Sequence, residues 1–367
     1  MDNELDKTNL LITKTGEIIK HLSPAYFGLV MATGIVSIGA ELLGMHLLAM
    51  SLFIINLIAF FLLWILYLVR LLFYTRFFLE DLKSHQAGMG FFTIVAGTCV
   101  VGTQVIVITE NYRYSQMLLV LGVTLWVLLS SIIFPMLTIK EKKPPLNEGI
   151  TGGWLLAVVA TQSISVLTAL IASHWDQPYK LEANFFAFSM WLWGGMLYIW
   201  MISLIFYRYT FFTFSPGDLA PPYWINMGAM AISTLAGSLL IMNEGHAPFL
   251  HSLLPFIKGF TIFYWATGTW WIPMLILLAA WRHIYKKFPL KYDPLYWGAV
   301  FPLGMYTVAT LRMAQAMDLP FLLPIPEYFI YLAIVAWIVT FFGLIKRQIS
   351  IFSQSTKLIP SGNERSP

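Results

Sequence analysis

The chain has little of two things that soluble proteins use freely, charged residues and cysteine. Of its 367 residues, 11% are charged and 58% are hydrophobic, whereas about a quarter of the residues in an ordinary soluble domain are charged. A soluble fold of this length has no room to hide so much apolar surface. The single cysteine, Cys99, excludes an intrachain disulfide and a thiolate metal cluster.

Ten apolar runs are long enough to cross a membrane as helices, because a hydrocarbon core about 30 Å thick needs about 20 apolar residues. Lipid offers backbone polar groups no partner, so spans of this length must be helical. We expect an all-α integral membrane protein with a transmembrane domain over 24–346. The predicted spans are 24–44, 47–75, 88–109, 115–139, 153–173, 184–208, 222–243, 255–285, 295–316 and 326–346.

The segments outside this domain are short. Residues 1–23 are charged throughout and lack the apolar region of a cleaved signal peptide, so we expect them to lie in the cytoplasm. Residues 347–367 form the predicted cytoplasmic tail.

The basic residues divide unequally between the two ends of the predicted spans. With both termini in the cytoplasm, 18 of the 22 lysines and arginines fall on the cytoplasmic side. The remaining four are Arg113, Lys180, Lys258 and Arg312. This asymmetry follows the positive-inside rule and predicts a multi-pass protein of the plasma or inner membrane. The net charge of +4 therefore reflects orientation in the membrane, and we expect no nucleic-acid partner.

The odd-numbered spans share a pattern, an aromatic residue followed by small, apolar and hydroxyl residues. They align on Phe27, Phe92, Trp154, Trp224 and Trp297. The even-numbered spans are bulky and aromatic, as suits a lipid-facing surface. The pattern predicts five helical-hairpin repeats, with the small-residue helices inside around a central pore. The alternative is that these small residues serve close helix packing and leave no opening.

The alignment selects candidate pore-lining positions. Four residues beyond each aligned aromatic stand Met31, Ala96, Val158, Gly228 and Phe301. Hydroxyl residues follow at equivalent or nearly equivalent positions: Thr33, Thr98, Thr161, Ser233 and Thr307.

Phe301 is the one large aromatic residue at its aligned position, and it directly precedes Pro302. Proline has no amide hydrogen, so Pro302 frees the carbonyl of Gly298 and kinks the helix. Gly304 follows in the same span, beyond the expected kink.

Ionisable residues stand near the ends of the predicted spans and not at their middles. This disfavours a pump or a proton-coupled transporter with an internal carboxylate. Arg312 near the outer end either attracts anions to an outer vestibule or reaches the headgroups or pairs with Glu327 or Asp318. The spacing of Glu244, His246 and His251 within one loop matches no established zinc-binding motif. We expect no metal, no cofactor and no enzymatic activity.

Two stretches carry a resemblance to a known family, "SPAYFGLVMATGIVSIGA" in the first span and "WGAVFPLGMYTVAT" in the ninth. With the hairpin pattern, they resemble the TehA and slow-type anion channel family. It includes bacterial tellurite-resistance proteins, the slow anion channel of plant guard cells and the fungal malate permease. The resemblance implies a homotrimer of ten-helix protomers, each with its own pore, and a gating phenylalanine that maps onto Phe301.

The chain departs from that family at two points. The span after Trp154 has no interior glycine or proline, and the long charged tails of the plant channel are missing. The leading hypothesis is an anion channel or channel-like facilitator for small inorganic or carboxylate anions. The alternatives are a proton-coupled transporter of dicarboxylates such as malate, a tellurite-resistance exporter, and a scaffold or receptor that transports nothing.

Overall fold

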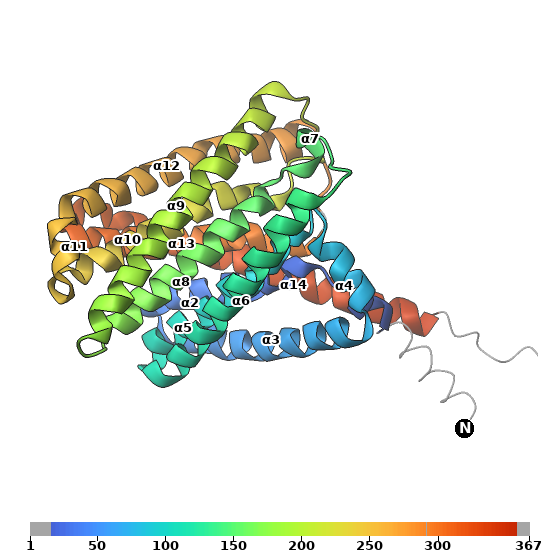
Figure 1. Ribbon diagram of the computed structural model, residues 1–367. Helices are drawn as coiled ribbons and strands as arrows, with labels where there is room; N and C mark the ends of the chain where they lie inside the picture. The colour runs from blue at the N-terminus through green and yellow to red at the C-terminus, as the bar shows by residue number, and fades with distance from the viewer. Residues whose placement is uncertain (1–15, 291, 358–367) are drawn as a thin grey trace, which may run out of the picture.

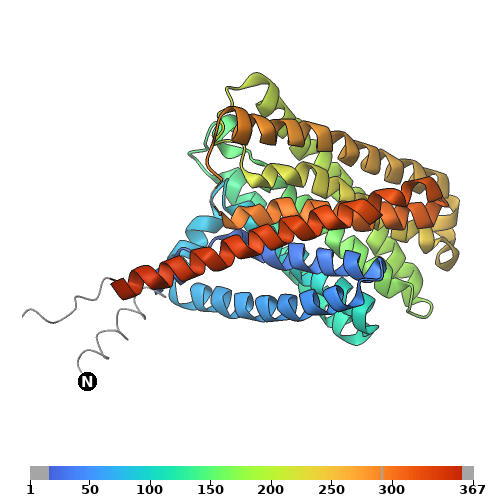
Figure 2. The same cartoon turned by 180° about the vertical axis from the view of Figure 1, so that it is seen from behind.

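The computed structural model describes residues 16–290 and 292–357, and these residues form helices without strands. The predicted segments 1–23 and 347–367 thus lie partly outside the described residues. The long helices run side by side along one axis (Figure 1), and Figure 2 shows the bundle from behind. They are α2 (Gly28–Leu42), α3 (His46–Phe73), α5 (Phe92–Thr109), α6 (Tyr112–Ile139), α8 (Leu156–Ala172), α9 (Tyr179–Phe211), α10 (Ile225–Met242), α12 (Leu254–Ala280), α13 (Trp297–Met317) and α14 (Pro324–Lys357). Shorter helices are α4 (Thr75–Leu82), α7 (Leu146–Gly149) and α11 (Pro248–Ser252).

Nine segments of the described chain are long and apolar enough to span a membrane. They agree with nine of the predicted spans to within about six residues at either end. The ninth predicted span, 295–316, forms α13, which has 21 residues but is less apolar than the others. Its proline, glycines, hydroxyl residues and Arg312 reduce its hydropathy. An all-α integral membrane protein is therefore confirmed, and the count of ten spans stays a prediction.

The helices fall into two classes by burial. Buried residues make up 89% of the apolar window in the span of α5 and 94% in those of α8 and α10, but 17% in that of α6 and 22% in that of α12. The buried helices contact one another in the order α2, α5, α8, α10, α13 and back to α2, so they close a ring. We call these five the inner helices, and α3, α6, α9, α12 and α14 the outer helices. The small-residue segments of the sequence are the inner ones.

Each inner helix begins with a short 3-10 turn. These turns are η1 (Pro24–Phe27), η2 (Gly88–Phe91), η3 (Gly152–Leu155), η4 (Pro221–Trp224) and η7 (Pro294–Tyr296). Proline suits the first helical position because its missing N–H has no helical partner there. Glycine is needed at 152, where a Cβ atom would lie 2.5 Å from the carbonyl oxygen of Pro222. The shared start is what a hairpin repeat requires, although the internal repeat itself stays a prediction.

Tryptophan side chains of the outer helices form hydrogen bonds to the inner helices. Three indole N–H groups donate to threonine hydroxyls of the neighbouring inner helix, Trp337 to Thr33, Trp126 to Thr161 and Trp265 to Thr310, at 2.9, 2.9 and 3.0 Å. A fourth, from Trp191 of α9, donates to the backbone oxygen of Ser233 in α10 at 2.8 Å. In each case the outer helix belongs to the preceding hairpin, so these bonds hold successive hairpins together.

Candidate anion pathway

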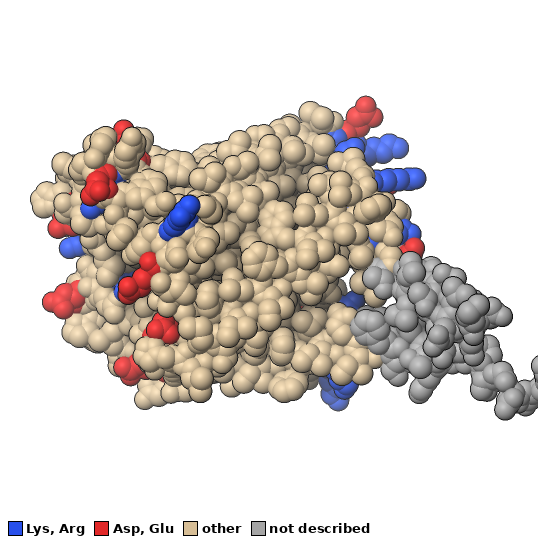
Figure 3. Space-filling model, turned by 90° about the horizontal axis from the view of Figure 1, so that it is seen from below, with Lys and Arg blue, Asp and Glu red and all other residues tan. Residues whose placement is uncertain are grey.

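A cavity of about 580 Å³ opens where the inner helices begin. Each of the five 3-10 turns contributes a residue to its wall: Ala25, Gly90, Gly153, Pro222 and Leu295. We call this cavity the vestibule. On the face seen in Figure 3, lysine and arginine gather mainly at this end of the molecule, which carries α4 and α7, and most of the carboxylates in view lie at the opposite end.

A second, much smaller cavity of about 20 Å³ lies deeper along the ring. It shares Ala25, Leu156, Pro222 and Leu295 with the vestibule. Each of the five inner helices contributes to the wall of this cavity one residue at the same depth along the ring. These five residues are Gly28, Thr93, Leu156, Ile225 and Gly298. The space holds roughly one water molecule, since a water needs about 10–15 Å³ measured in this way. The passage therefore narrows sharply between the vestibule and this second cavity.

Two predicted site residues meet at the small cavity. Met31 and Phe301 both line it, one helical turn beyond Gly28 and Gly298. Phe301 is only 1% exposed, and Met31 is 2% exposed. Pro302 continues α13 and presses against Gly228 of α10. The sequence alignment thus placed Met31 and Phe301 at one level, where the structure has them.

The third repeat unit, which the sequence analysis aligned on Trp154, was aligned one residue too early. The other four units line the small cavity with the residue directly after the aligned aromatic, but the third uses Leu156, two residues after Trp154. The side chain of Trp154 instead binds nearby loops: its indole N–H donates hydrogen bonds to the carbonyl oxygens of His85 and Gly149, both at 3.0 Å. Leu155, which is fully buried, takes the place of the aligned aromatic. Position 158 is therefore one residue short of the level of Met31.

The predicted hydroxyl residues are all fully buried, and their bonds are made within the protein. Thr33 and Thr161 accept the indole bonds from the outer helices described above. The other three donate to the carbonyl one turn earlier, Thr98 to Ile94, Ser233 to Ala229 and Thr307 to Leu303, at 2.8, 2.8 and 3.0 Å. Their role as a pore lining stays a prediction.

The small residues of the predicted lining serve close packing. A Cβ atom at Gly304 would lie 2.9 Å from Cγ2 of Ile35 in α2. Ala96 and Val158 are fully buried. The inner helices thus pack tightly at Gly304, a small cavity remains beside Gly28 and Gly298, and a continuous pore stays a prediction.

Arg312 lies near the far end of α13 and is half-buried. Its Nη1 donates to Oε1 of Gln315 at 3.0 Å, one turn along the same helix. The described residues contain no ion pair from Arg312 to Glu327 or Asp318, so its role at an outer vestibule stays a prediction.

Cations at the ends of four outer helices have a role that the sequence analysis missed. Each donates to a carbonyl that precedes the inner helix of its own hairpin: Arg70 to Lys20, Lys140 to Lys83, Arg208 to Ile150 and Arg282 to Leu219. We call these four the clasp cations. A signal was present, since a cation recurs at the end of each outer span. The positive-inside rule explains why these cations are at the predicted cytoplasmic ends of the spans but does not predict their bonds to carbonyl groups.

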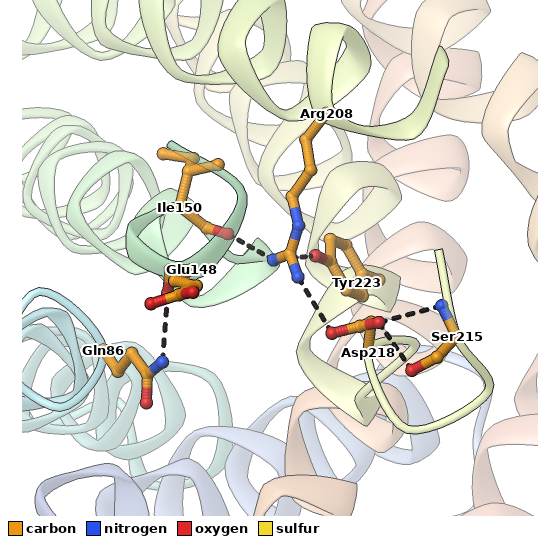
Figure 4. A network of polar contacts seen from close by, with 7 residues as sticks. All are labelled: Gln86, Glu148, Ile150, Arg208, Ser215, Asp218 and Tyr223. Carbon is orange, nitrogen blue, oxygen red and sulfur yellow. Dashed lines mark hydrogen bonds and ion pairs between the residues drawn. The ribbon is translucent and has the colours of Figure 1, made fainter. Parts of the chain in front are cut away.

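Arg208 shows how completely such a cation is used (Figure 4). Its side chain is 8% exposed, and it donates to the Tyr223 hydroxyl at 2.8 Å and to Oδ1 of Asp218 at 3.2 Å. Ser215 donates to the other carboxylate oxygen through its hydroxyl at 2.6 Å and its amide at 2.8 Å. These bonds, with Arg208 beside them, hold the pKa of Asp218 below its ordinary value. The vestibule wall at Arg208 is therefore nearly neutral.

The inner helices supply a different positive potential. Each runs away from the vestibule, so its N-terminal end, the positive end of the helix dipole, faces that cavity. Five such ends surround one opening. The arrangement favours an anion at the mouth without placing a free charged side chain in the narrow part.

A closed ring of buried helices around a narrowing axial cavity, sheathed by lipid-facing helices, is the architecture of a membrane transport protein. The chain belongs to the voltage-dependent anion channel family, whose model matches residues 21–345. This is a family of channels and transporters. Together with the relatives below, it supports an anion transporter or channel.

Two of the three relatives below span most of the chain. An uncharacterized transporter of Methanocaldococcus jannaschii is 28% identical over 304 residues, covering 80% of this chain and 84% of its own length. A sulfite efflux pump of Trichophyton rubrum is 26% identical over 354 residues, covering 88% of this chain and 90% of its own length. An uncharacterized membrane protein of Mycobacterium tuberculosis is 35% identical over 159 residues, covering 43% of this chain and 80% of its own length.

Proposed function

We propose that the protein is an anion channel, or channel-like facilitator, whose pore runs along the ring axis and is closed by Phe301. The observation that carries this proposal is the small cavity that all five inner helices line and at which Phe301 lies. With space for roughly one water molecule, the cavity is too small for an anion that keeps its hydration shell. The ring of Phe301 must move for such an anion to pass.

Pro302 supports this role of its neighbour. It removes the helical hydrogen bond to the carbonyl of Gly298, and Gly298 belongs to the cavity wall. A helix that lacks a bond beside the cavity bends there more easily than a regular helix. The proposed gate therefore lies where α13 lacks a backbone hydrogen bond.

The preference for anions rests on the five helix ends and on a neutral interior. Among the described residues, the buried polar side chains are hydroxyls and amides, apart from Arg70, Arg208 and Arg282 at helix ends. Such a lining binds an anion weakly enough to release it, as conduction requires. We propose small inorganic anions as substrates, and the sulfite efflux pump among the relatives makes sulfite the first to test. Tellurite belongs to the same test.

A second candidate is a proton-coupled transporter of dicarboxylates such as malate. It is favoured by relatives that are described as transporters or pumps and not as channels. Uptake into liposomes separates the two, because a coupled transporter saturates and depends on the proton gradient, whereas a channel follows the gradient of the anion.

We also propose a homotrimer in the plasma or inner membrane with both termini in the cytoplasm. The charge asymmetry of Figure 3 supports this orientation through the positive-inside rule. The vestibule then faces the cytoplasm, and efflux is the direction in which anions enter by the wider cavity.

The test compares Phe301→Ala with wild type in liposomes loaded with chloride, nitrate, sulfite or tellurite. We expect anion flux to rise severalfold or more in the variant. Phe92→Ala is the matched control, because Phe92 is equally buried in an inner helix but packs against Phe134 of α6. Unchanged flux in Phe301→Ala, with folding and assembly intact, would reject Phe301 as the gate.

A further inference from the structure

A groove of about 700 Å³ lies on the side of the bundle, away from the ring axis. One wall is the part of α14 from Val339 to Ser350, and the other is formed by Leu290, Tyr292, Asp293 and Tyr296, which precede α13 in the chain. Figure 2 shows α14 running along this side of the bundle and projecting beyond it. The groove is separate from the vestibule, whose lining residues lie elsewhere, and it is not explained by anion transport.

Two adjacent cations line the groove, Lys346 and Arg347, and both are exposed. Among the described residues, neither forms an ion pair with a carboxylate. The guanidinium of Arg347 lies over the ring of Tyr292, 5.9 Å from its centre, which holds it toward the groove. These two cations differ from the buried clasp arginines, which donate hydrogen bonds to carbonyl groups inside the protein.

One carboxylate, Asp293, also lines the groove. Its Oδ1 accepts a hydrogen bond from the amide of Leu295 at 2.8 Å, where it caps the turn η7. Tyr292 and Tyr296 line the same wall, and burial raises the pKa of both phenols, so they stay neutral. The groove therefore keeps an excess of positive charge.

The position of the groove matches the boundary between hydrocarbon and headgroups. Lys346 and Arg347 lie in the last two turns of the apolar span Pro320–Ser350. On the hydrocarbon side of them, Val339 and Phe342 are 61% and 66% exposed, as suits contact with acyl chains. Arginine and lysine at this depth, with apolar surface beside them, are what an anionic phospholipid requires.

We propose that this groove binds the headgroup of an anionic phospholipid. Its phosphate lies between Lys346 and Arg347, within reach of the hydroxyl of Ser350, and its acyl chains follow Val339 and Phe342. Guanidinium and ammonium groups form charge-assisted hydrogen bonds to phosphate, which are about twice as strong as neutral ones. Because the groove is also lined by residues next to α13, an occupied groove couples the lipid to the helix that carries Phe301.

The experiment is native mass spectrometry of the purified full-length protein with phosphatidylglycerol or phosphatidylcholine added. We expect wild type to retain phosphatidylglycerol about 25-fold better than phosphatidylcholine, since each of the two cations near the membrane surface contributes about 1 kcal/mol, which is roughly fivefold. Lys346→Gln/Arg347→Gln is expected to lose this preference. The control is Lys142→Gln/Lys143→Gln, which removes two exposed neighbouring lysines outside the groove, and it is expected to keep the preference.

Three outcomes would overturn the proposal. The first is an equal loss in both double variants, which means general attraction to negative lipid. The second is displacement of phosphatidylglycerol by millimolar inorganic phosphate, which means a site for the free anion. The third is a change of oligomeric state in Lys346→Gln/Arg347→Gln with lipid retention unaltered, which means that the groove is an interface between copies. A thermal melt without added lipid checks that both double variants are folded.

Discussion

Gly228 of α10 lies directly against Pro302 of α13. A Cβ atom at Gly228 would lie 2.8 Å from Cγ of the proline, closer than real Cβ atoms approach other atoms, and 3.1 Å from its Cβ, which is also tight. No side chain fits between the two helices at this point. Pro302 directly follows Phe301, which lines the small cavity.

Gly228→Ala is therefore expected to push α13 away from α10. Overpacking of this kind costs about 1–3 kcal/mol, so we expect a lower melting temperature together with altered basal anion flux. Pro302→Ala in the same chain removes Cγ and should restore part of the stability. Gly259→Ala is the control, because a Cβ atom there meets nothing within 4 Å. Equal stability of Gly228→Ala and Gly259→Ala would contradict this account.

The indole bond from Trp337 to Thr33 is expected to stabilise the contact between α14 and α2. Trp337→Phe keeps the aromatic stacking on Phe341 but removes the donor. We expect a loss of about 0.5–1.5 kcal/mol in the free energy of unfolding. Trp200→Phe, at a residue that is 50% exposed on α9, should cost less.

A double-mutant cycle isolates this bond. If it accounts for the effect, Trp337→Phe combined with Thr33→Val costs little more than either change alone. Additive costs would show that the two residues act independently.

Asp218 gives the protein a dependence of stability on pH. Its pKa is lowered in the folded protein, first by the hydroxyl of Ser215 and further by the Ser215 amide and Arg208. The carboxylate then stabilises the fold above its ordinary pKa, and this contribution is lost as the pH falls through the lowered value. We expect Asp218→Asn to lower the melting temperature at pH 7, and we expect its difference from wild type to shrink as the pH falls below the ordinary aspartate pKa of about 3.9.

The control for this effect is Glu141→Gln, at an exposed carboxylate of the same end of the molecule. Its difference from wild type should be small at every pH. A difference between Asp218→Asn and wild type that stays constant from neutral to acidic pH would refute the role of the ionised carboxylate.

The sequence and the structure agree where the signal is a property of a whole helix. Long apolar runs and the contrast between small and bulky spans predicted the helices and their inner and outer classes. Single-residue register was less secure. In the third unit, an aromatic residue at 154 drew the alignment one position away from Leu155, although the side chain of Trp154 turns to the loop carbonyls of His85 and Gly149.

Composition, hydropathy and the distribution of lysine and arginine were enough to establish a helical, multi-pass membrane protein. The reason is that lipid requires each span to be helical and long enough to cross the hydrocarbon core. They did not reveal which hydroxyl faces which neighbour. Thr33 and Thr161 accept bonds from the outer helices, and the clasp cations bind carbonyls far away in the chain, because such pairings depend on how the helices rotate against one another. That rotation is decided by packing between residues distant in the chain, such as Gly228 and Pro302, and only the assembled ring contains it.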